Sequence, residues 1–260
     1  MYENETEFAC RMADAAGAEI LKYFRRPLNI EDKTDTSPVT QGDKNSERVM
    51  REMIKERFPD HGIVGEEYGR ENENAEFVWV LDPIDGTKSF IAGLPLFGIL
   101  IALLHNGRPV VGVIDQPYAR ERWVGVEGKP TTLNGKEIHT RPCPALKQAV
   151  LFSTADKLMF VKPEEKRSFN ALCSETKIER FSTDCYGYGL LAAGFGDIIC
   201  ETDLKLYDYA ALVPVVTGAG GVMTDWAGND LFDSPDRDGK ALAVGDKRLL
   251  KEAVEVLRNE

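Results

Sequence analysis

The strongest candidates for chemistry are two aspartates that follow an apolar stretch. Residues 77–82 (FVWVLD) predict a buried strand that ends at Asp82, because Pro83 cannot continue the hydrogen-bond ladder. Asp85 follows three positions later, so both carboxylates can converge at the carboxyl end of a strand, where ligands bind in α/β sheets. With the backbone carbonyl of Ile84 they offer hard oxygen ligands, which suit Mg²⁺ rather than Zn²⁺.

The next two residues are suited to hold an anion. Gly86 permits an unusual backbone angle and the close approach of a ligand. If Thr87 opens a helix, the amides of Gly86 and Thr87 would face a phosphate. A plainer interpretation stays open, because Asp-Pro and Asp-Gly pairs are also ordinary turn sequences.

The chain is acidic, with a formal net charge of -11 over 260 residues. That charge argues against general nucleic-acid binding, which needs a basic face. It would also repel a phosphate substrate, so a phosphate site in this chain needs a bound cation. The length suits one large α/β domain or two small ones packed together.

Neither the cysteines nor the histidines have the spacing of a zinc site. The 5 cysteines include no C-x-x-C pair, and the 3 histidines no H-x-x-H pair. We interpret the cysteines as reduced thiols of a cytoplasmic protein. The N-terminus lacks the features of a signal peptide. The longest apolar run, about residues 94–104, is far shorter than the roughly 20 residues that span a bilayer, so we expect no membrane partner.

The first half of the chain predicts helices before the aspartates and strands after them. Apolar residues recur at helical spacing over 3–26 and over 44–57, where Asp43 would cap the helix. The polar stretch 31–42 predicts a loop, and 62–66 a short strand that ends in carboxylates. Three further predicted strands are joined by turns such as Asn106-Gly107, which indicates an antiparallel meander. These strands are 97–104, 109–115 and 121–127.

From residue 149 onward, predicted strands and helices alternate, which is typical of α/β structure. The strands are 149–153, 177–181, 197–201, 221–225 and 240–244, and the helices are 163–173, 185–194, 207–217 and 246–258. We place a boundary near residue 145. It divides an N-terminal half (1–145), which carries the aspartate motif, from a C-terminal half (146–260), which completes the site.

Several segments, in order along the chain, resemble those of the inositol monophosphatase family. They are residues 82–87 (DPIDGT), 65–67, 206–211, 220–225, and 37–40 with Asp43. Tyr207 stands where the family usually has Trp. The resemblance covers about residues 5–255. It implies an α/β fold of alternating αβαβα layers, with a larger mixed or antiparallel sheet and a smaller α/β half. It also implies a homodimer.

The same resemblance implies a phosphatase with two or three Mg²⁺ ions per site and no covalent intermediate. Glu66, Asp82 and the carbonyl of Ile84 would hold the first ion. Asp82, Asp85 and Asp208 would hold the second. The first ion would lower the pKa of its water and so supply hydroxide at neutral pH.

Other residues would act on the water and on the phosphate. Glu66 and the Thr87 hydroxyl would orient the attacking water, and Asp43 would support Thr87. The amides of Gly86 and Thr87 would hold phosphate oxygens, while the second ion neutralises the leaving oxygen. Glu67 would support a further, weaker ion.

Two segments are most similar to the histidinol-phosphate phosphatase branch of that family. They are residues 85–98 (DGTKSFIAGLPLFG) and 184–190 (DCYGYGL). Histidinol phosphate carries an ammonium and an imidazole, so its pocket should offer carboxylates. Asp184 and Glu201 align with the family's substrate-facing positions, and Asp208 lies near. An ion pair of Asp184 with the ammonium would favour an amino substrate over a polyol, although Asp184 could instead only cap the helix near Cys185.

The sequence also allows other roles for single residues and other functions for the chain. Lys88 and Lys33 could screen the phosphate charge, but most lysines are solvated surface residues. A haloacid-dehalogenase phosphatase needs an Asp-x-Asp spacing that Asp82 and Asp85 lack. A non-catalytic metal- or polyol-binding module would not need a water-orienting Thr and Glu. Within the family, an inositol-1-monophosphatase or a broad phosphate-monoester phosphatase would share the same metal residues.

Overall fold

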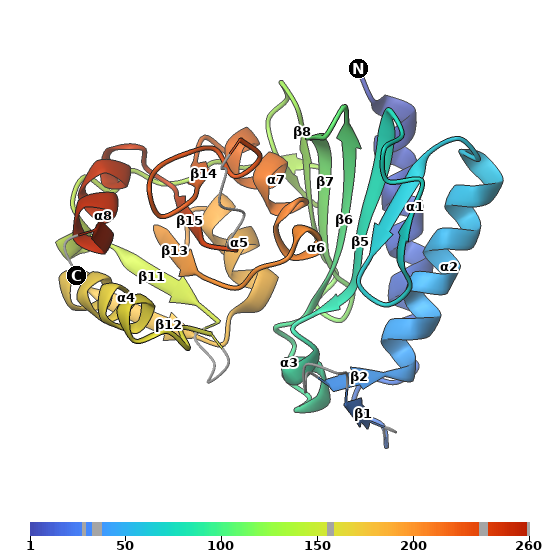
Figure 1. Ribbon diagram of the computed structural model, residues 1–260, viewed down its shortest axis with the longest axis horizontal. Coiled ribbons are helices and arrows are strands. Elements are labelled where there is room, and N and C mark those ends of the chain that lie inside the picture. Colours follow the sequence, from blue (N-terminus) through green and yellow to red (C-terminus); the bar gives the residue numbers. More distant parts are fainter. Residues whose placement is uncertain (28–29, 33–37, 155–158, 234–238, 259–260) are drawn as a thin grey trace.

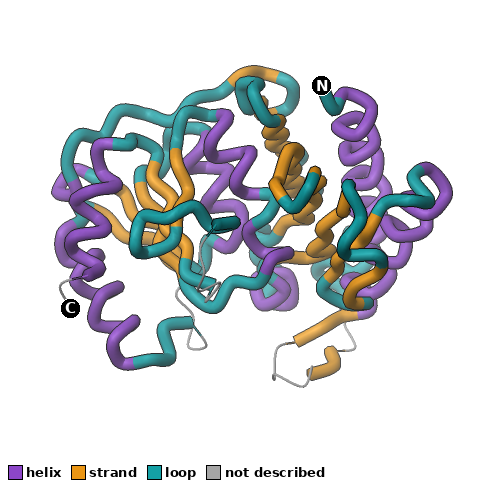
Figure 2. The backbone as a smooth tube through the Cα atoms, turned by 45° about the horizontal axis from the view of Figure 1, so that its top comes forward, coloured by secondary structure: helices purple, strands orange, loops and turns teal. Residues whose placement is uncertain are grey.

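The computed structural model describes residues 1–27, 30–32, 38–154, 159–233 and 239–258. Helices and sheets alternate in five layers across the molecule, and Figure 2 shows helices outside and between the two groups of strands (Figure 1, Figure 2). This confirms the expected layered α/β fold. The predictions made for Lys33 and Ser37 lie outside the described residues.

Two helices cover the outer face of the larger sheet (Figure 1). They are α1 (Glu3–Ile20) and α2 (Gln41–Arg57). The first helix ends at Ile20, six residues earlier than predicted, and turns follow it. Asp43 is not the N-cap of the second: Thr40 accepts from the Gly42 amide at 3.1 Å, and Asp43 accepts from the Thr40 amide at 2.8 Å. Thr40 and Asp43 therefore form a capping box, in which Thr40 is the N-cap and Asp43 is the third helical residue.

The larger sheet has eight strands in the order β10-β9-β8-β7-β6-β5-β3-β4. They are β3 (Gly62–Gly65), β4 (Gly69–Glu71), β5 (Phe77–Asp85), β6 (Gly98–His105), β7 (Arg108–Gln116), β8 (Glu121–Val126), β9 (Thr132–Leu133) and β10 (Lys136–Glu137). The predicted meander is confirmed, since β5 to β8 pair antiparallel in sequence order. Asn106 and Gly107 both have positive φ, as the mirror-image hairpin turn requires. The predicted loop 31–42 contains two further strands, β1 (Ile30–Asp32) and β2 (Pro38–Thr40), paired with each other.

The prediction that the aspartate strand ends at Asp82 is wrong. Strand β5 continues through Pro83 to Asp85, with Asp82 opposite Leu100 and Asp85 opposite Gly98. Three steps on one strand therefore face two on the other, which is a β-bulge. Proline is tolerated at a bulge because the extra residue is unpaired there.

The smaller sheet is mixed, with the order β12-β11-β13-β15-β14. Its strands are β11 (Val150–Ser153), β12 (Ile178–Phe181), β13 (Ile198–Glu201), β14 (Val222–Thr224) and β15 (Ala241–Val244). Helices α4 (Pro163–Glu175) and α8 (Arg248–Arg258) cover its outer face (Figure 1). All five strands agree with their predicted positions to within one residue.

Three helices lie between the sheets (Figure 1). They are α5 (Asp184–Ala192), α6 (Leu206–Tyr209) and α7 (Leu212–Gly218). The predicted helix 207–217 is thus two helices. A continuous helix would press the Pro214 ring against the carbonyl four residues earlier, whereas Pro214 fits in the first turn of α7. Helix α7 also lies very close to strand β8, because a Cβ on Gly125 of β8 would lie 2.3 Å from the Pro214 carbonyl carbon.

One buried apolar cluster joins the two sheets through these middle helices. It includes Leu100 and Trp123 from the larger sheet, Tyr188 from α5, Val215 from α7 and Ile199 from the smaller sheet. The larger sheet ends at β10 and the smaller begins at β11, on either side of residue 145. We keep the boundary near 145 as a proposal. Among the described residues, no helix has both the length and the apolar character to cross a membrane.

Candidate active site

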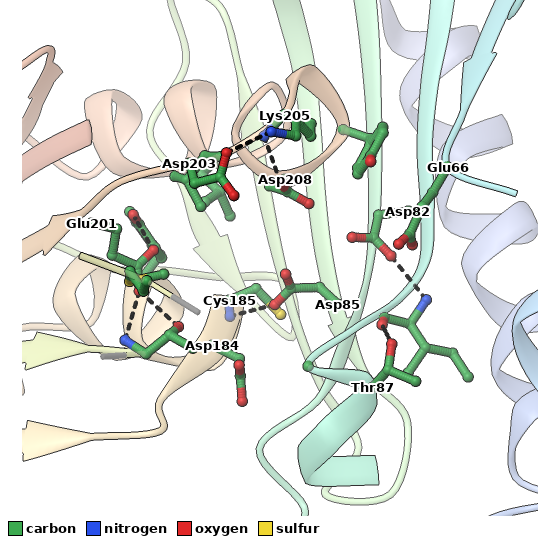
Figure 3. Close-up of a pocket in the computed structure, with 18 of the residues that line it drawn as sticks. Glu66, Asp82, Asp85, Thr87, Asp184, Cys185, Glu201, Asp203, Lys205 and Asp208 are labelled. Atoms are coloured by element: carbon green, nitrogen blue, oxygen red, sulfur yellow. Dashed lines mark hydrogen bonds and ion pairs between the residues drawn. The ribbon is translucent and has the colours of Figure 1, made fainter. Parts of the chain in front are cut away.

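Three aspartates converge at the junction of the two halves. Asp82 and Asp85 come from the bulged end of β5, and Asp208 comes from α6. One carboxylate oxygen from each lies within 4.8 Å of the others. Figure 3 shows the three side chains directed toward one another, with Glu66 beside Asp82. The bulge matters because it lets both β5 aspartates face the same side.

Backbone amides hold each of the three carboxylates in place. The Ile84 amide donates to Asp82 at 3.0 Å, and the Cys185 amide of α5 donates to Asp85 at 2.6 Å. The Lys205 amide donates to Asp208 at 2.6 Å. The first and third of these bonds are local, whereas the Cys185 amide comes from the other half, so the position of Asp85 depends on how the halves pack.

The cluster is electrostatically unfavourable without a cation. Burial, and then the neighbouring carboxylates, raise the pKa of Asp82 and Asp85 well above the ordinary range. Burial raises the pKa of Asp208 to about 8. A divalent cation bound by hard oxygen atoms would offset this repulsion, so the donor set fits Mg²⁺.

Thr87 stands at the start of a short helix behind the cluster, α3 (Thr87–Ile91). Its hydroxyl lies 3.0 Å from the Ile84 carbonyl oxygen and 3.4 Å from Asp43 Oδ1. Asp43 is buried, and burial raises its pKa to about 6. Gly86 has φ 80°, and a Cβ there would lie 2.9 Å from Asp184 Cγ, so a larger residue does not fit.

Two further carboxylates lie on the side of the smaller sheet, across the site from Glu66 (Figure 3). Asp184 is the first residue of α5, after Thr183, and it accepts a hydrogen bond from Ser89 at 2.7 Å. Glu201 ends β13 and is 3% exposed. Burial raises the pKa of Glu201 to about 7. Asp184 is therefore not the helix cap, because its carboxylate is directed at α3.

A cavity of about 370 Å³ connects these groups. Among the predicted site residues that the structure describes, Asp43 and Glu67 do not line the cavity, and Asp43 lies behind Thr87. The others line it. These lining residues are Glu66, Asp82, Ile84, Asp85, Gly86, Thr87, Lys88, Asp184, Glu201 and Asp208. Glu67 is not among the lining residues, and its amide donates to Glu47 at 2.7 Å.

Sequence reasoning missed two residues that line the cavity and hold Glu201. They are Thr154, after β11, and Tyr188, on α5. It also missed Ser89, which donates to Asp184. A Tyr in an apolar helix and a Thr after a strand are ordinary core residues, so only their contacts reveal a role.

A model of the inositol monophosphatase family matches residues 1–259. The chain is 46% identical to the chloroplastic bifunctional phosphatase IMPL2 of Arabidopsis thaliana, over 95% of this chain and 72% of that protein. It is 31% identical to a histidinol-phosphatase of Chlorobaculum parvum, over 98% and 97%.

The solved structures agree. An inositol monophosphatase structure from Zymomonas mobilis matches with a TM-score of 0.89 and 44% identity, over 99% of this chain and 98% of that one. With the acidic cluster and its cavity, these matches lead to one conclusion: the chain belongs to the inositol monophosphatase family and is a phosphatase.

Proposed function

We propose that this phosphatase is Mg²⁺-dependent and hydrolyses L-histidinol phosphate to L-histidinol and phosphate, a step of histidine biosynthesis. The observation that carries the proposal is the position of Asp184 and Glu201, which line the cavity outside the three-aspartate cluster. They offer negative charge to the ammonium and imidazole end of the substrate, while the phosphate lies at the cluster. The match to a histidinol-phosphatase supports this choice.

Residues already in place would hold the metal ions. Glu66, Asp82 and the Ile84 carbonyl would hold one ion, and Asp82, Asp85 and Asp208 another. Bound Mg²⁺ would supply Lewis-acid activation of water and neutralise charge on the phosphate. We propose that each site binds two or three Mg²⁺ ions.

The chain's own groups position the reactants. Glu66 accepts a proton of the attacking water, and the Thr87 hydroxyl, fixed by its neighbours Ile84 and Asp43, orients that water. The amides of Gly86 and Thr87 hold phosphate oxygens. The water oxygen bonds to phosphorus as its proton passes to Glu66, and the ester P–O bond breaks. The leaving histidinol oxygen takes a proton from solvent water, and Glu66 returns its proton to solvent. Lys88, which is exposed at the cavity, screens the phosphate charge.

Inositol 1-phosphate is the second candidate substrate. It is favoured by the Zymomonas mobilis structure, which is titled an inositol monophosphatase and is 44% identical to this chain. A polyol would use the same metal residues, but its neutral hydroxyls would gain less from the two outer carboxylates than a cation would. We also propose that the protein is a cytoplasmic homodimer. The Arabidopsis relative, in contrast, is named as a chloroplastic protein.

The deciding experiment measures phosphate release from histidinol phosphate and from inositol 1-phosphate, side by side, with Mg²⁺ and with a chelator. We expect a clear preference for histidinol phosphate that disappears on chelation. Preference for inositol 1-phosphate would contradict the substrate assignment. Activity that survives chelation would contradict the metal assignment.

A variant of Asp184 tests the role of charge. Asp184→Ala should lower kcat/KM for histidinol phosphate by about tenfold or more, the value of one charge-assisted hydrogen bond or ion pair. Turnover of inositol 1-phosphate should change much less, because it presents no cation. Equal losses on the two substrates would contradict this role of Asp184.

A further inference from the structure

Glu201 is a buried carboxylate held by donors from two different elements. Its Oε1 accepts from the amide and the hydroxyl of Thr154, both at 2.7 Å, and its Oε2 accepts from the Tyr188 hydroxyl at 2.9 Å. Both oxygens are therefore engaged, and rotation of the carboxylate would break at least one bond. The two bonds from Thr154 occupy both lone-pair sites of Oε1, whereas Oε2 keeps one site for a further donor.

Tyr188 is in turn fixed by the packing of α5. It is 1% exposed and lies between two glycines. A Cβ on Gly189 would lie 2.7 Å from the ring of Trp123 on β8, and one on Gly187 would lie 2.6 Å from Thr183 Oγ1. Gly189 lets α5 approach β8 closely, and Gly187 leaves room for the side chain of Thr183 at the start of the same helix. This packing determines how far the Tyr188 hydroxyl reaches.

The donors favour the charged form of Glu201. Burial alone raises the pKa of this carboxyl, and the hydrogen bonds from Thr154 and Tyr188 oppose that rise. On balance the pKa of Glu201 is raised to about 7. The three hydrogen bonds fix the orientation of its carboxylate, which is therefore suited to accept from a cation in the cavity.

We propose that Tyr188 is a positioning residue that holds Glu201 as the acceptor for the cationic end of an amino phosphate substrate. The inference rests on the proposed function, because it needs a substrate with a cation. Tyr188 donates to Glu201 and not to the aspartate cluster. Cleavage of a phosphate ester that has no cationic group therefore does not depend on Tyr188.

The test uses Tyr188→Phe, which removes only the hydroxyl. KM for histidinol phosphate should rise about tenfold with kcat nearly unchanged, as expected for the loss of a hydrogen bond to a charged group that aids binding. Kinetics with glycerol 2-phosphate, which carries no cation, should not change. Tyr186→Phe is the matched control, since Tyr186 on the same helix donates to Glu121 at 2.6 Å and does not line the cavity.

A double-mutant cycle separates positioning from a general structural effect. If Tyr188 acts through Glu201, adding Tyr188→Phe to Glu201→Gln should cause no further loss. Additive losses, or equal losses on both substrates, would overturn the inference. If Tyr188→Phe does not fold, Thr154→Val removes a donor to the other oxygen and takes its place in the cycle.

The two proposals fail in different ways. Wild-type enzyme that does not prefer histidinol phosphate over inositol 1-phosphate contradicts the proposed function, and the inference with it. A wild-type preference that Tyr188→Phe leaves intact, in a folded variant, contradicts the inference alone.

Discussion

At the scale of single residues, the site is a set of carboxylates that disfavour one another until a cation binds. The pKa of Asp82 is raised by burial first and by Glu66 and the other aspartates next. A raised pKa means that the ionised form is destabilised in the folded protein at neutral pH. The same residues that enable metal binding should therefore reduce the stability of the metal-free protein.

The first prediction concerns Asp82→Asn. This change removes a charge but keeps an oxygen that can accept from the Ile84 amide. We expect loss of turnover, and a Tm of the metal-free protein that rises by about 3 °C or more, since one pKa unit corresponds to about 1.4 kcal/mol. Calorimetry in chelator measures the change in Tm.

Asp246→Asn is the control of opposite sign. The Arg248 guanidinium holds the pKa of Asp246 below its usual range, so neutralising this carboxylate should lower Tm. A metal-free Asp82→Asn protein that is less stable than wild type would contradict our account of the cluster.

At the scale of elements, the site depends on two local departures from regular structure. The bulge in β5 directs Asp82 and Asp85 to one side. Immediately after it, the left-handed Gly86 starts α3 and lies against Asp184 of α5. The turn thus joins the aspartate cluster to the side of the cavity that Asp184 lines.

The second prediction concerns Gly86→Ala. A Cβ would be strained at φ 80° and would collide with Asp184. We expect a stability loss of more than about 1–2 kcal/mol, the cost of the left-handed backbone alone, and a large loss of kcat/KM. Denaturant unfolding and steady-state kinetics measure the two effects.

Gly128→Ala is the control for Gly86→Ala, because the two glycines have similar left-handed backbone angles but different surroundings. Gly128 has φ 72°, and a Cβ there would meet nothing within 4 Å. It should show the backbone cost without the collision and without loss of activity. Equal effects of the two substitutions would mean that the contact with Asp184 is unimportant.

At the scale of the whole molecule, the cluster is assembled by the packing of two halves. Asp85 in the first half accepts from the Cys185 amide in the second, and Asp208 of α6 completes the group. A cation bound there would link the halves and should stabilise the entire fold.

The third prediction is a pH-dependent effect of Mg²⁺ on stability. The folded pKa of Asp208, about 8, exceeds its ordinary value of 3.8, so the metal-free folded state binds more protons than the unfolded state between these values. Metal-free stability should therefore contain a term that falls as pH rises through this window. At 100 times its Kd, Mg²⁺ should add about 2.7 kcal/mol, or about 5–10 °C in Tm.

Thermal unfolding with Mg²⁺ and with chelator, between pH 5.5 and about 8.5, tests this prediction. The difference in Tm should grow with pH, because protons compete with the metal for the carboxylates. A difference independent of pH would show that the metal does not bind to the groups with raised pKa values.

Patterns along the chain were enough to predict those parts of this protein that depend on neighbouring residues. Apolar periodicity and turn pairs such as Asn106-Gly107 predicted most elements and the meander, and the motif at Asp82–Thr87 identified the family. Local errors came from competing local chemistry, as at the capping box of Thr40, or from the bulge, whose extra residue only the partner strand reveals.

Contacts between residues far apart in the chain could not be predicted and became visible only in the folded protein. The contacts of Tyr188 and Thr154 with Glu201, and of Ser89 with Asp184, join segments between 13 and 95 residues apart. Neither residue type nor spacing specifies such pairs, because they follow from how α3, α5 and the smaller sheet pack. The proposed metal ligands of β5 were therefore readable from the motif, while the hydroxyls that hold Asp184 and Glu201 emerged only from the folded chain.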